Sequence, residues 1–304
     1  MSRQVLVSVV GPTAIGKTKL AIALAKHFRT EIISADSRQF YKEMNIGTAV
    51  PSKEELSAVP HHFIQHISIK DNYSVGAFER DAIKTLEQLF KKHKVVIMVG
   101  GSGLYVNAVT EGLDHFPAVD PQIREQLNST LKEKGLSALQ SRLKQLDPDY
   151  YKQIDLDNPH RLIRALEVSI SSGLPYSSFL NKRKVRRPFK VITIGLTAER
   201  EIIYSRINKR VDLMMQQGLL EEVKALRAYQ ELNALITVGY KELFKYLKGD
   251  WELNFAISEI KKNTRRFAKR QLTWFKKNKD ISWIDYKESH SAVIKKVEQL
   301  IERL

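Results

Sequence analysis

Eight residues near the N-terminus have the types and spacing of a phosphate-binding loop. They are Gly11, Pro12, Thr13, Ala14, Ile15, Gly16, Lys17 and Thr18. The glycines let the backbone curl, so that its N–H groups and the positive end of a following helix can hold phosphate oxygens. Lys17 adds a positive charge, and the Thr18 hydroxyl can bind Mg²⁺. Because an apolar run precedes the loop and an amphipathic run follows it, the sequence predicts a polyphosphate site of the nucleotide-binding P-loop type, in preference to a turn that only starts a helix. The pattern does not say whether the polyphosphate is ATP.

An acidic residue is expected beside this loop. Residues 31–34 read as a short strand that runs into Asp36, and ligands bind at the carboxyl ends of strands in a doubly wound sheet. Position alone leaves Asp36 open between a role near the phosphates and that of an N-cap or turn residue. Another strand, residues 95–99, ends in glycines around Ser102, where nucleotide-hydrolysing P-loop enzymes usually carry a metal-binding aspartate. This difference weakens the prediction of an ATPase.

Basic residues are abundant enough to favour a polyanionic partner. The net charge is +16, which indicates a nucleic acid more than a merely solvated surface, without choosing between DNA and RNA. Residues 261–279 hold nine basic and no acidic residues within a predicted long helix, 254–279. We expect one stripe of this helix to be positive, made of Lys262, Arg266, Lys269 and Lys276. We expect a second stripe to be buried, made of Ile260, Phe267 and Trp274.

Two pairs of arginines have helical spacing. Arg161 and Arg164 lie three residues apart on one predicted helix and could be solvated or could bind phosphates. Arg206 and Arg210 lie one turn apart on another and could face the phosphate loop or the solvent.

The order of the segments predicts an α/β fold with a P-loop NTPase-like parallel sheet core and an all-helical insertion domain. Apolar runs without alternation read as buried parallel strands, namely residues 5–10, 95–99 and 189–196. Helical periodicity is expected over residues 17–28, 75–91 and 198–228, and residues 51–75 read as a loop. Between about residues 115 and 188 only helical patterns occur, with helices starting near Pro121, Leu136 and Pro159. The core domain would therefore be discontinuous, comprising 1–114 and 189–304, with the insertion at 115–188.

Composition and patterning exclude several other classes of site. The chain has no cysteine, which excludes disulfides and thiolate-bound zinc. His61 and His62 are adjacent and lack an acidic partner at ligand spacing, so we expect structural roles for them. No secretory leader and no run of membrane-spanning length is found, so the expected location is cytoplasmic, with no membrane partner. We also expect a monomer.

Six stretches in combination resemble the bacterial tRNA dimethylallyltransferase family, also called tRNA isopentenyltransferases or IPP transferases. They are GPTAIGKT (11–18), ISADSRQFYKEMNIGTA (33–49), VGGSGLY (99–105), HRLIRALEV (160–168), TVGYKE (237–242) and TRRFAKRQLTWFK (264–276). They span most of the chain and occur in the family's order. Ser102 stands where the family usually has threonine and keeps the hydroxyl, and the position of His160 is variable in the family.

The resemblance implies the transfer of a dimethylallyl group from dimethylallyl diphosphate to N6 of an adenosine in tRNA. That adenosine lies just 3′ of the anticodon, in tRNAs that read codons starting with U. The products are N6-(dimethylallyl)adenosine and diphosphate, with Mg²⁺ as cofactor. Lys17, Thr18 (through Mg²⁺) and Arg210 would stabilise the leaving diphosphate, and Asp36 would accept the proton from N6.

The resemblance also implies that the helical insertion and other segments contact the tRNA anticodon stem-loop. The expected tRNA-binding residues are Asp36, Ser37, Arg38, Gln39, Ser102, Arg124, His160, Arg161, Leu162, Ile163, Arg164, Val238, Gly239, Tyr240, Lys241, Arg266, Lys269 and Arg270.

Three other functions share some of these features. An adenylate isopentenyltransferase acting on AMP, ADP or ATP would need the phosphate loop and Asp36 but neither the helical insertion nor the basic helix. A P-loop kinase of a small metabolite would consume ATP. A nucleic-acid-binding protein with a relic phosphate site would bind tRNA without transferring a prenyl group.

Overall fold

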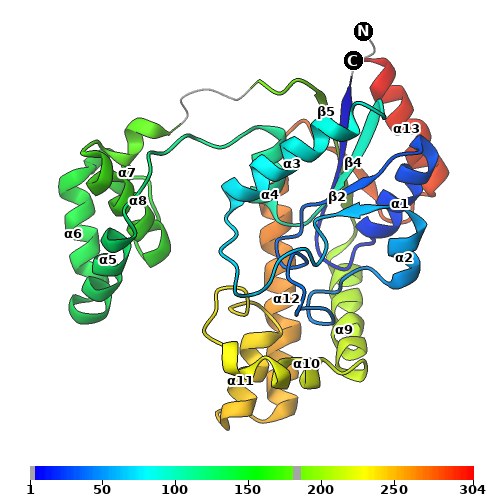
Figure 1. Cartoon of the computed structure of the whole chain (residues 1–304). Helices are drawn as coiled ribbons and strands as arrows, with labels where there is room; N and C mark the ends of the chain where they lie inside the picture. The colour runs from blue at the N-terminus through cyan, green and yellow to red at the C-terminus, as the bar shows by residue number, and fades with distance from the viewer. Residues whose placement is uncertain (1–3, 181–185) are drawn as a thin grey trace. The chain divides into compact units, whose positions relative to one another are not determined.

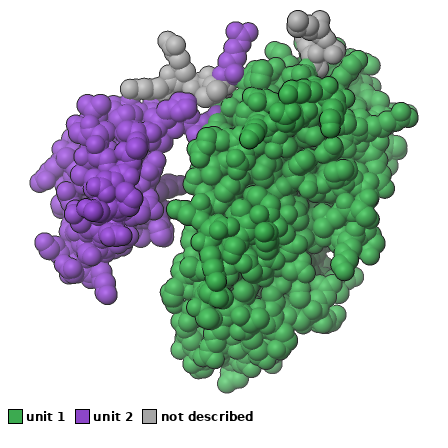
Figure 2. Space-filling model, in the orientation of Figure 1, with its two compact units in different colours: residues 1–111, 187–304 green, residues 112–186 purple. Residues whose placement is uncertain are grey.

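The computed structural model describes residues 4–180 and 186–304, so the ends of the predicted domain ranges at 1–3 and 181–185 lie outside the described residues. The chain forms two compact units, shown in different colours in Figure 2. The first comprises residues 1–111 and 187–304, and the second residues 112–186.

The first unit is built on one parallel sheet, seen in Figure 1. Its strands in spatial order are β3 (His61–His62), β2 (Ile32–Ser34), β4 (Val95–Val99), β1 (Val5–Val10), β5 (Lys190–Thr197) and β6 (Ser282–Asp285). In register, Val5 is paired with Val95 on one side and with Lys190 on the other. β1 is therefore a central strand, and every residue in it is buried, which explains its apolar run without alternation. The predicted α/β fold class is confirmed.

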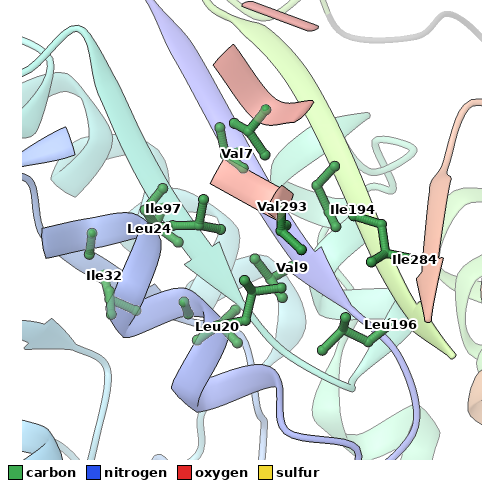
Figure 3. Packing of buried hydrophobic residues seen from close by; sticks show 14 of the residues in the cluster. Val7, Val9, Leu20, Leu24, Ile32, Ile97, Ile194, Leu196, Ile284 and Val293 are labelled. Carbon is green, nitrogen blue, oxygen red and sulfur yellow. The ribbon is translucent and has the colours of Figure 1, made fainter. Parts of the chain in front are cut away.

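Helices cover both faces of the sheet because successive side chains of β1 point to opposite sides. Val7 and Val9 pack with Leu20 and Leu24 of α1 (Lys17–Phe28) and with Val293 of α13 (His290–Glu302), as Figure 3 shows. On the other face, the residues of β1 that alternate with these pack against α3 (Val75–Leu89) and α4 (Gly103–Thr110). The sheet is thus held rigidly between two helical layers, and its carboxyl edge carries the candidate site.

The remaining helices of this unit are α2 (Lys53–Ala58), α9 (Arg200–Gln216), α10 (Leu219–Ala225), η2 (Arg227–Tyr229), α11 (Tyr240–Lys248) and α12 (Leu253–Phe275). Four of these helices form a further core. Residues of α9, α10, α11 and α12 bury a third apolar cluster together with Tyr41 and Met44. This cluster joins the segment that contains Tyr41 and Met44, which follows α1 and β2 in the chain, to the C-terminal helices.

The second unit is helical throughout its described part. Its elements are α5 (Pro121–Lys134), α6 (Leu136–Leu146), α7 (Pro148–Tyr151), α8 (Pro159–Ser172) and η1 (Tyr176–Phe179). α5 starts at an Asp120 N-cap, and α8 starts at an Asn158 N-cap whose side chain accepts a hydrogen bond from the N–H of Arg161. A core of leucines from α5, α6 and α8 fills the centre of this unit.

Several expectations about individual elements are wrong. Residues 51–75 contain α2 and the edge strand β3, both too short to give a periodic signal. The helix predicted over 198–228 is broken at Gly218, whose φ of 98° lies outside the helical range. Phe267 and Trp274 are each 38% exposed and do not form a buried stripe with Ile260. The side of α12 that faces the core instead carries Ala256, Ile260, Ala268, Gln271 and Phe275.

Candidate active site

The phosphate loop joins the end of β1 to the start of α1. Gly11, Ala14 and Gly16 have φ values of 141°, 63° and 110°, so the loop makes the turns that an inward-facing set of N–H groups requires. A side chain at residue 11 would place Cβ 2.6 Å from the carbonyl oxygen of Leu196, so only glycine fits there. Lys17 curls back over the loop, and its Nζ donates to the carbonyl of Pro12 at 2.8 Å.

Three charged side chains meet at this loop. Burial lowers the pKa of Lys17 from 10.5 to about 8; the nearby Asp36 carboxylate opposes this change, and the nearby Arg210 guanidinium adds to it. Burial also lowers the pKa of Arg210, again opposed by Asp36. The structure therefore brings Lys17, Asp36 and Arg210 close enough for their charges to interact, at the carboxyl edge of the sheet.

Helix α9 supplies two guanidinium groups to the same loop. Arg206 Nε donates to the carbonyl of Ala14 at 2.7 Å, and Arg210 Nη1 donates to the hydroxyl of Thr13 at 3.4 Å. The one-turn spacing of the two arginines places both on the side of α9 that faces the phosphate loop. Positive charge is thus concentrated where a polyphosphate would carry its negative charge.

Gln271 of α12, which is not among the site residues predicted from the sequence, also contacts the phosphate loop. It is only 6% exposed; its Oε1 accepts from the Thr13 N–H at 2.8 Å, and its Nε2 donates to the carbonyl of Gly101 at 2.9 Å. One side chain therefore joins the phosphate loop, the glycines after β4 and the basic helix. A polar residue between Ala268 and Phe275, on the side of α12 that is otherwise apolar, was the signal that could have identified it.

The segment from Asp36 to Gln39 is held beside the glycines after β4. Asp36 Oδ1 accepts from the N–H of Arg38 at 3.2 Å, and within the described residues no hydrogen bond reaches Oδ2. The Ser102 hydroxyl lies 3.1 Å from both the N–H and the hydroxyl of Ser37. Arg38 Nη1 donates to the carbonyls of Asn233 and Ala234, so its guanidinium is partly engaged. The structure brings Asp36, Ser37 and Ser102 together next to the phosphate loop.

Residues 238–241, which are predicted to bind tRNA, differ in their exposure. Val238 is partly exposed and Lys241 is exposed. Tyr240, however, is completely buried, and its hydroxyl donates to Glu222 at 2.6 Å. The N–H of Gly239 is taken by Glu242. The prediction that Tyr240 binds tRNA stays a prediction, and in this structure its ring lies in the core.

Helix α12 presents three of its basic residues to the solvent, while Lys261, Lys262 and Arg265 are half-buried. Arg266, Lys269 and Arg270 are all exposed. The exposed Phe267 lies beside them, with the Arg270 guanidinium 5.8 Å from its ring centre. A mixed face of cations and aromatic rings suits both the phosphates and the bases of an unpaired nucleic acid.

In the second unit, two of the predicted tRNA-binding arginines share one buried carboxylate. Arg124 binds Glu167 through Nε at 2.6 Å and Nη2 at 2.8 Å, and Arg164 Nη1 binds it at 2.7 Å. Burial alone would raise the pKa of Glu167, but these hydrogen bonds outweigh burial and lower it. Arg124 thus links α5 to α8, whereas Arg164 bonds Glu167 within α8. The two arginines and the one carboxylate together keep a net positive charge.

The other predicted residues of α8 divide by exposure. His160 and Arg161 are exposed at its first turn. Leu162 and Ile163 lie in the leucine core of this unit, so in this structure their side chains are buried, and their predicted role in tRNA binding stays a prediction. A sequence motif does not reveal which of its members face inward.

One side-chain hydroxyl in the site has the chemistry to help hold a substrate-bound Mg²⁺. Mg²⁺ usually keeps several waters and binds through one or two protein oxygens together with substrate phosphates. Thr18, next to Lys17 in the first turn of α1, offers such an oxygen. In the part of the chain that the structure describes, no cluster of three or more His, Cys, Asp or Glu residues could hold a metal on its own.

The described part of the chain contains no helix that is both long and apolar enough to span a membrane.

Comparisons with known proteins show the family of this chain. A model of the IPP transferase family matches residues 39–278. The tRNA dimethylallyltransferase of Christiangramia forsetii is 63% identical, covering 97% of this chain and 98% of its own, and that of Flavobacterium johnsoniae is 56% identical, covering 95% and 96%.

Solved structures give the same result. A tRNA isopentenylpyrophosphate transferase from Bacillus halodurans has a TM-score of 0.73 and 36% identity, covering 99% of this chain and 96% of its own. A eukaryotic dimethylallyltransferase acting on tRNA has a TM-score of 0.83 and 25% identity, covering 99% and 80%. The family resemblance seen in the sequence is confirmed: this chain belongs to the IPP transferase family.

Proposed function

We propose that this enzyme transfers a dimethylallyl group from dimethylallyl diphosphate to N6 of the adenosine just 3′ of the anticodon, in tRNAs that read codons starting with U. Membership of the IPP transferase family and the names of its relatives support this proposal. The structural observation that carries it is the placement of Lys17 and Arg210 on the phosphate loop, with Asp36 just beyond the end of strand β2 and within electrostatic range of both. A phosphate cradle and a carboxylate side by side are what an alkylation of an amine by an allylic diphosphate requires.

The diphosphate is the leaving group, so negative charge grows on it as the bond between the allylic carbon and oxygen breaks. The N–H groups of residues 14–18, together with the side chains of Lys17 and Arg210, would stabilise that charge; Pro12 has no N–H, and the N–H of Thr13 donates to Gln271. Mg²⁺, bound through Thr18 and the phosphates, would offset further charge on the diphosphate. No ATP is consumed in this reaction, in agreement with the glycines that follow β4 where an ATPase usually carries an aspartate.

The nucleophile is the exocyclic N6 of adenine, whose lone pair is delocalised into the ring. As the bond between N6 and the allylic carbon forms, N6 becomes more acidic and must lose one proton. Oδ2 of Asp36, which has no hydrogen bond among the described residues, would accept that proton and orient the amine beforehand. The balanced products are the alkylated adenosine, diphosphate and one proton.

The adenine must leave its stack to reach Asp36, at a cost of a few kcal/mol. We assign the compensating contacts to Ser37 and Ser102 near Asp36, to the exposed cations of α12, and to His160 and Arg161 in the second unit. Arg124 and Arg164 contribute their residual positive charge, and residues 115–188 act as a helical insertion that contacts the anticodon stem-loop. We also propose that the enzyme is monomeric and cytoplasmic.

A competition experiment tests the acceptor. Purified protein is given isotopically labelled dimethylallyl diphosphate and Mg²⁺, with an anticodon stem-loop RNA and AMP present together at equal concentration. We expect label in the RNA alone, since free AMP cannot use the contacts of the basic helix or of the second unit. A preference for AMP would instead assign the chain an adenylate isopentenyltransferase activity.

A further inference from the structure

The side chain of Glu222 binds the backbone of residues 45–47, a loop far from it in the sequence. Glu222 lies on α10, and its carboxylate accepts four hydrogen bonds. The N–H groups of Asn45 and Ile46 donate to Oε2 at 3.1 and 2.7 Å, and the N–H of Gly47 donates to Oε1 at 3.0 Å. The fourth donor is the Tyr240 hydroxyl, 2.6 Å from Oε1. One side chain therefore joins residues 45–47 to the start of α11.

The carboxylate suits this position better than a neutral side chain would. Three successive N–H groups that converge on one point form a concave site for an anion, and hydrogen bonds to a charged acceptor are stronger than neutral ones. Burial raises the pKa of Tyr240, and the nearby carboxylate of Glu222 raises it further. The Tyr240 hydroxyl therefore stays protonated and can donate. Gly47 lies against the Tyr240 ring so closely that a Cβ would be 2.5 Å from Cε2. Tyr240 therefore contacts Glu222 through its hydroxyl and Gly47 through its ring.

The loop held by Glu222 in turn holds the segment that carries Asp36. Directly after Gly47, the carbonyls of Thr48 and Ala49 accept hydrogen bonds from Gln39 Nε2 at 3.2 and 3.0 Å. The N–H of Gln39 donates to the carbonyl of Asp36 at 3.0 Å. Residues 36–39 are therefore tied to residues 45–49, and residues 45–47 are tied to Glu222.

The same carboxylate fixes residues 238–241, a second segment that the family resemblance predicts to bind tRNA. Tyr240 is the first residue of α11, and Val238, Gly239 and Lys241 are its neighbours in the chain. Anchoring its hydroxyl fixes the point at which this segment turns into the helix. Glu222 lies in neither segment and yet contacts or supports both.

We propose that Glu222 is a positioning residue for RNA, which sets the relative placement of residues 36–39 and residues 238–241. The proposal rests on the proposed function, because it concerns the geometry with which the adenine meets Asp36. Glu222 does not contact the phosphate loop in this structure, so its role concerns the acceptor RNA and not the allylic diphosphate.

The test compares Glu222→Gln with Glu221→Gln. Glutamine keeps the shape of Glu222 but turns an NH₂ group toward donors. Glu221 is the matched control, because it lies on the same helix, is exposed and pairs only with Lys224 among the described residues. For each protein we would measure kcat and KM for an anticodon stem-loop, the Kd of an unreactive thio analogue of dimethylallyl diphosphate, and the thermal midpoint.

For Glu222→Gln we expect kcat/KM for the RNA to fall by about tenfold or more, since small displacements of a reacting group have effects of this size. The Kd of the diphosphate analogue should stay within about twofold, which a general loss of structure would not allow. Glu221→Gln should leave kcat, KM, the Kd of the analogue and the thermal midpoint unchanged. A value of kcat/KM within about twofold of the unmodified protein, or a parallel loss of diphosphate affinity, would overturn the proposal.

Tyr240→Phe provides a second variant in case Glu222→Gln does not fold. It removes one hydrogen bond to Glu222 and keeps the ring packed on Gly47. We expect kcat/KM for the RNA to fall by about threefold or more, with unchanged diphosphate affinity. Unchanged kcat/KM in this variant would contradict the proposal. If the unmodified protein transferred no prenyl group to RNA, the proposed function itself would fail, and the two failures are thus distinguishable.

Discussion

The affinity of the site for a diphosphate should decrease as the pH rises through 8, because Lys17 then loses its charge. Lys17 titrates with a pKa of about 8, lowered by its burial. Its charged fraction is therefore about 0.9 at pH 7 and about 0.09 at pH 9. If the diphosphate binds to the charged form, its Kd rises about tenfold over this range, equivalent to about 1.4 kcal/mol.

The measurement is a calorimetric titration with the unreactive thio analogue of dimethylallyl diphosphate, at fixed Mg²⁺ and ionic strength, between pH 7 and 9. Lys17→Met serves as the control, because it removes the titrating group while the ionisation of the ligand remains. The pH dependence of the unmodified protein should exceed that of Lys17→Met by about tenfold over the range. Asp36→Asn removes a carboxylate that raises the pKa of Lys17, so the midpoint should move below pH 8.

Equal pH dependence in the unmodified protein and in Lys17→Met would refute this reasoning. It would mean that Lys17 keeps the same charge across the range or takes no part in binding. A midpoint that moves upward in Asp36→Asn would show that the sign of the interaction between Asp36 and Lys17 is wrong.

Three further substitutions have distinct expected outcomes. Asp36→Asn should lower turnover by about 100-fold or more, with RNA affinity changed by less than about threefold, and retained turnover would exclude Asp36 as the base. Gln271→Leu leaves the Thr13 N–H and the Gly101 carbonyl without their partner, so KM for dimethylallyl diphosphate should rise by about tenfold; an unchanged KM would show that this link is dispensable. Arg124→Met leaves the buried Glu167 with one arginine, so the free energy of unfolding measured in urea should fall by about 2 kcal/mol, while an undiminished value would contradict a structural role for Arg124.

The features found from the sequence were those encoded in short stretches of it. The phosphate loop combines a local pattern with a buried strand before it and a helix after it, and the structure has β1 and α1 at the expected residues. The spacing of Arg206 and Arg210 placed both on one side of α9. In each case the information lies within a few turns of chain, where backbone geometry alone fixes which side chains share a face.

What the sequence did not predict depends on contacts between distant segments. Gln271 meets Thr13 across 258 positions, and Glu222 meets Asn45 across 177. No periodicity encodes such a contact, and both side chains read as ordinary polar residues of helices. For the same reason, Trp274 was assigned to the core of α12: its spacing from Ile260 is helical, but spacing alone does not say which face packs on the sheet.

The most direct test of the account is the mass of the nucleosides obtained from an anticodon stem-loop after incubation with the purified protein, dimethylallyl diphosphate and Mg²⁺. A matched stem-loop carries purine riboside, which lacks the 6-amino group, at the position 3′ of the anticodon. We expect the adenosine at that position to gain the mass of one dimethylallyl group in the first RNA, and no modified nucleoside from the second. Absence of the heavier adenosine from the first RNA, or an equal gain in the second, would contradict the proposed transfer to N6.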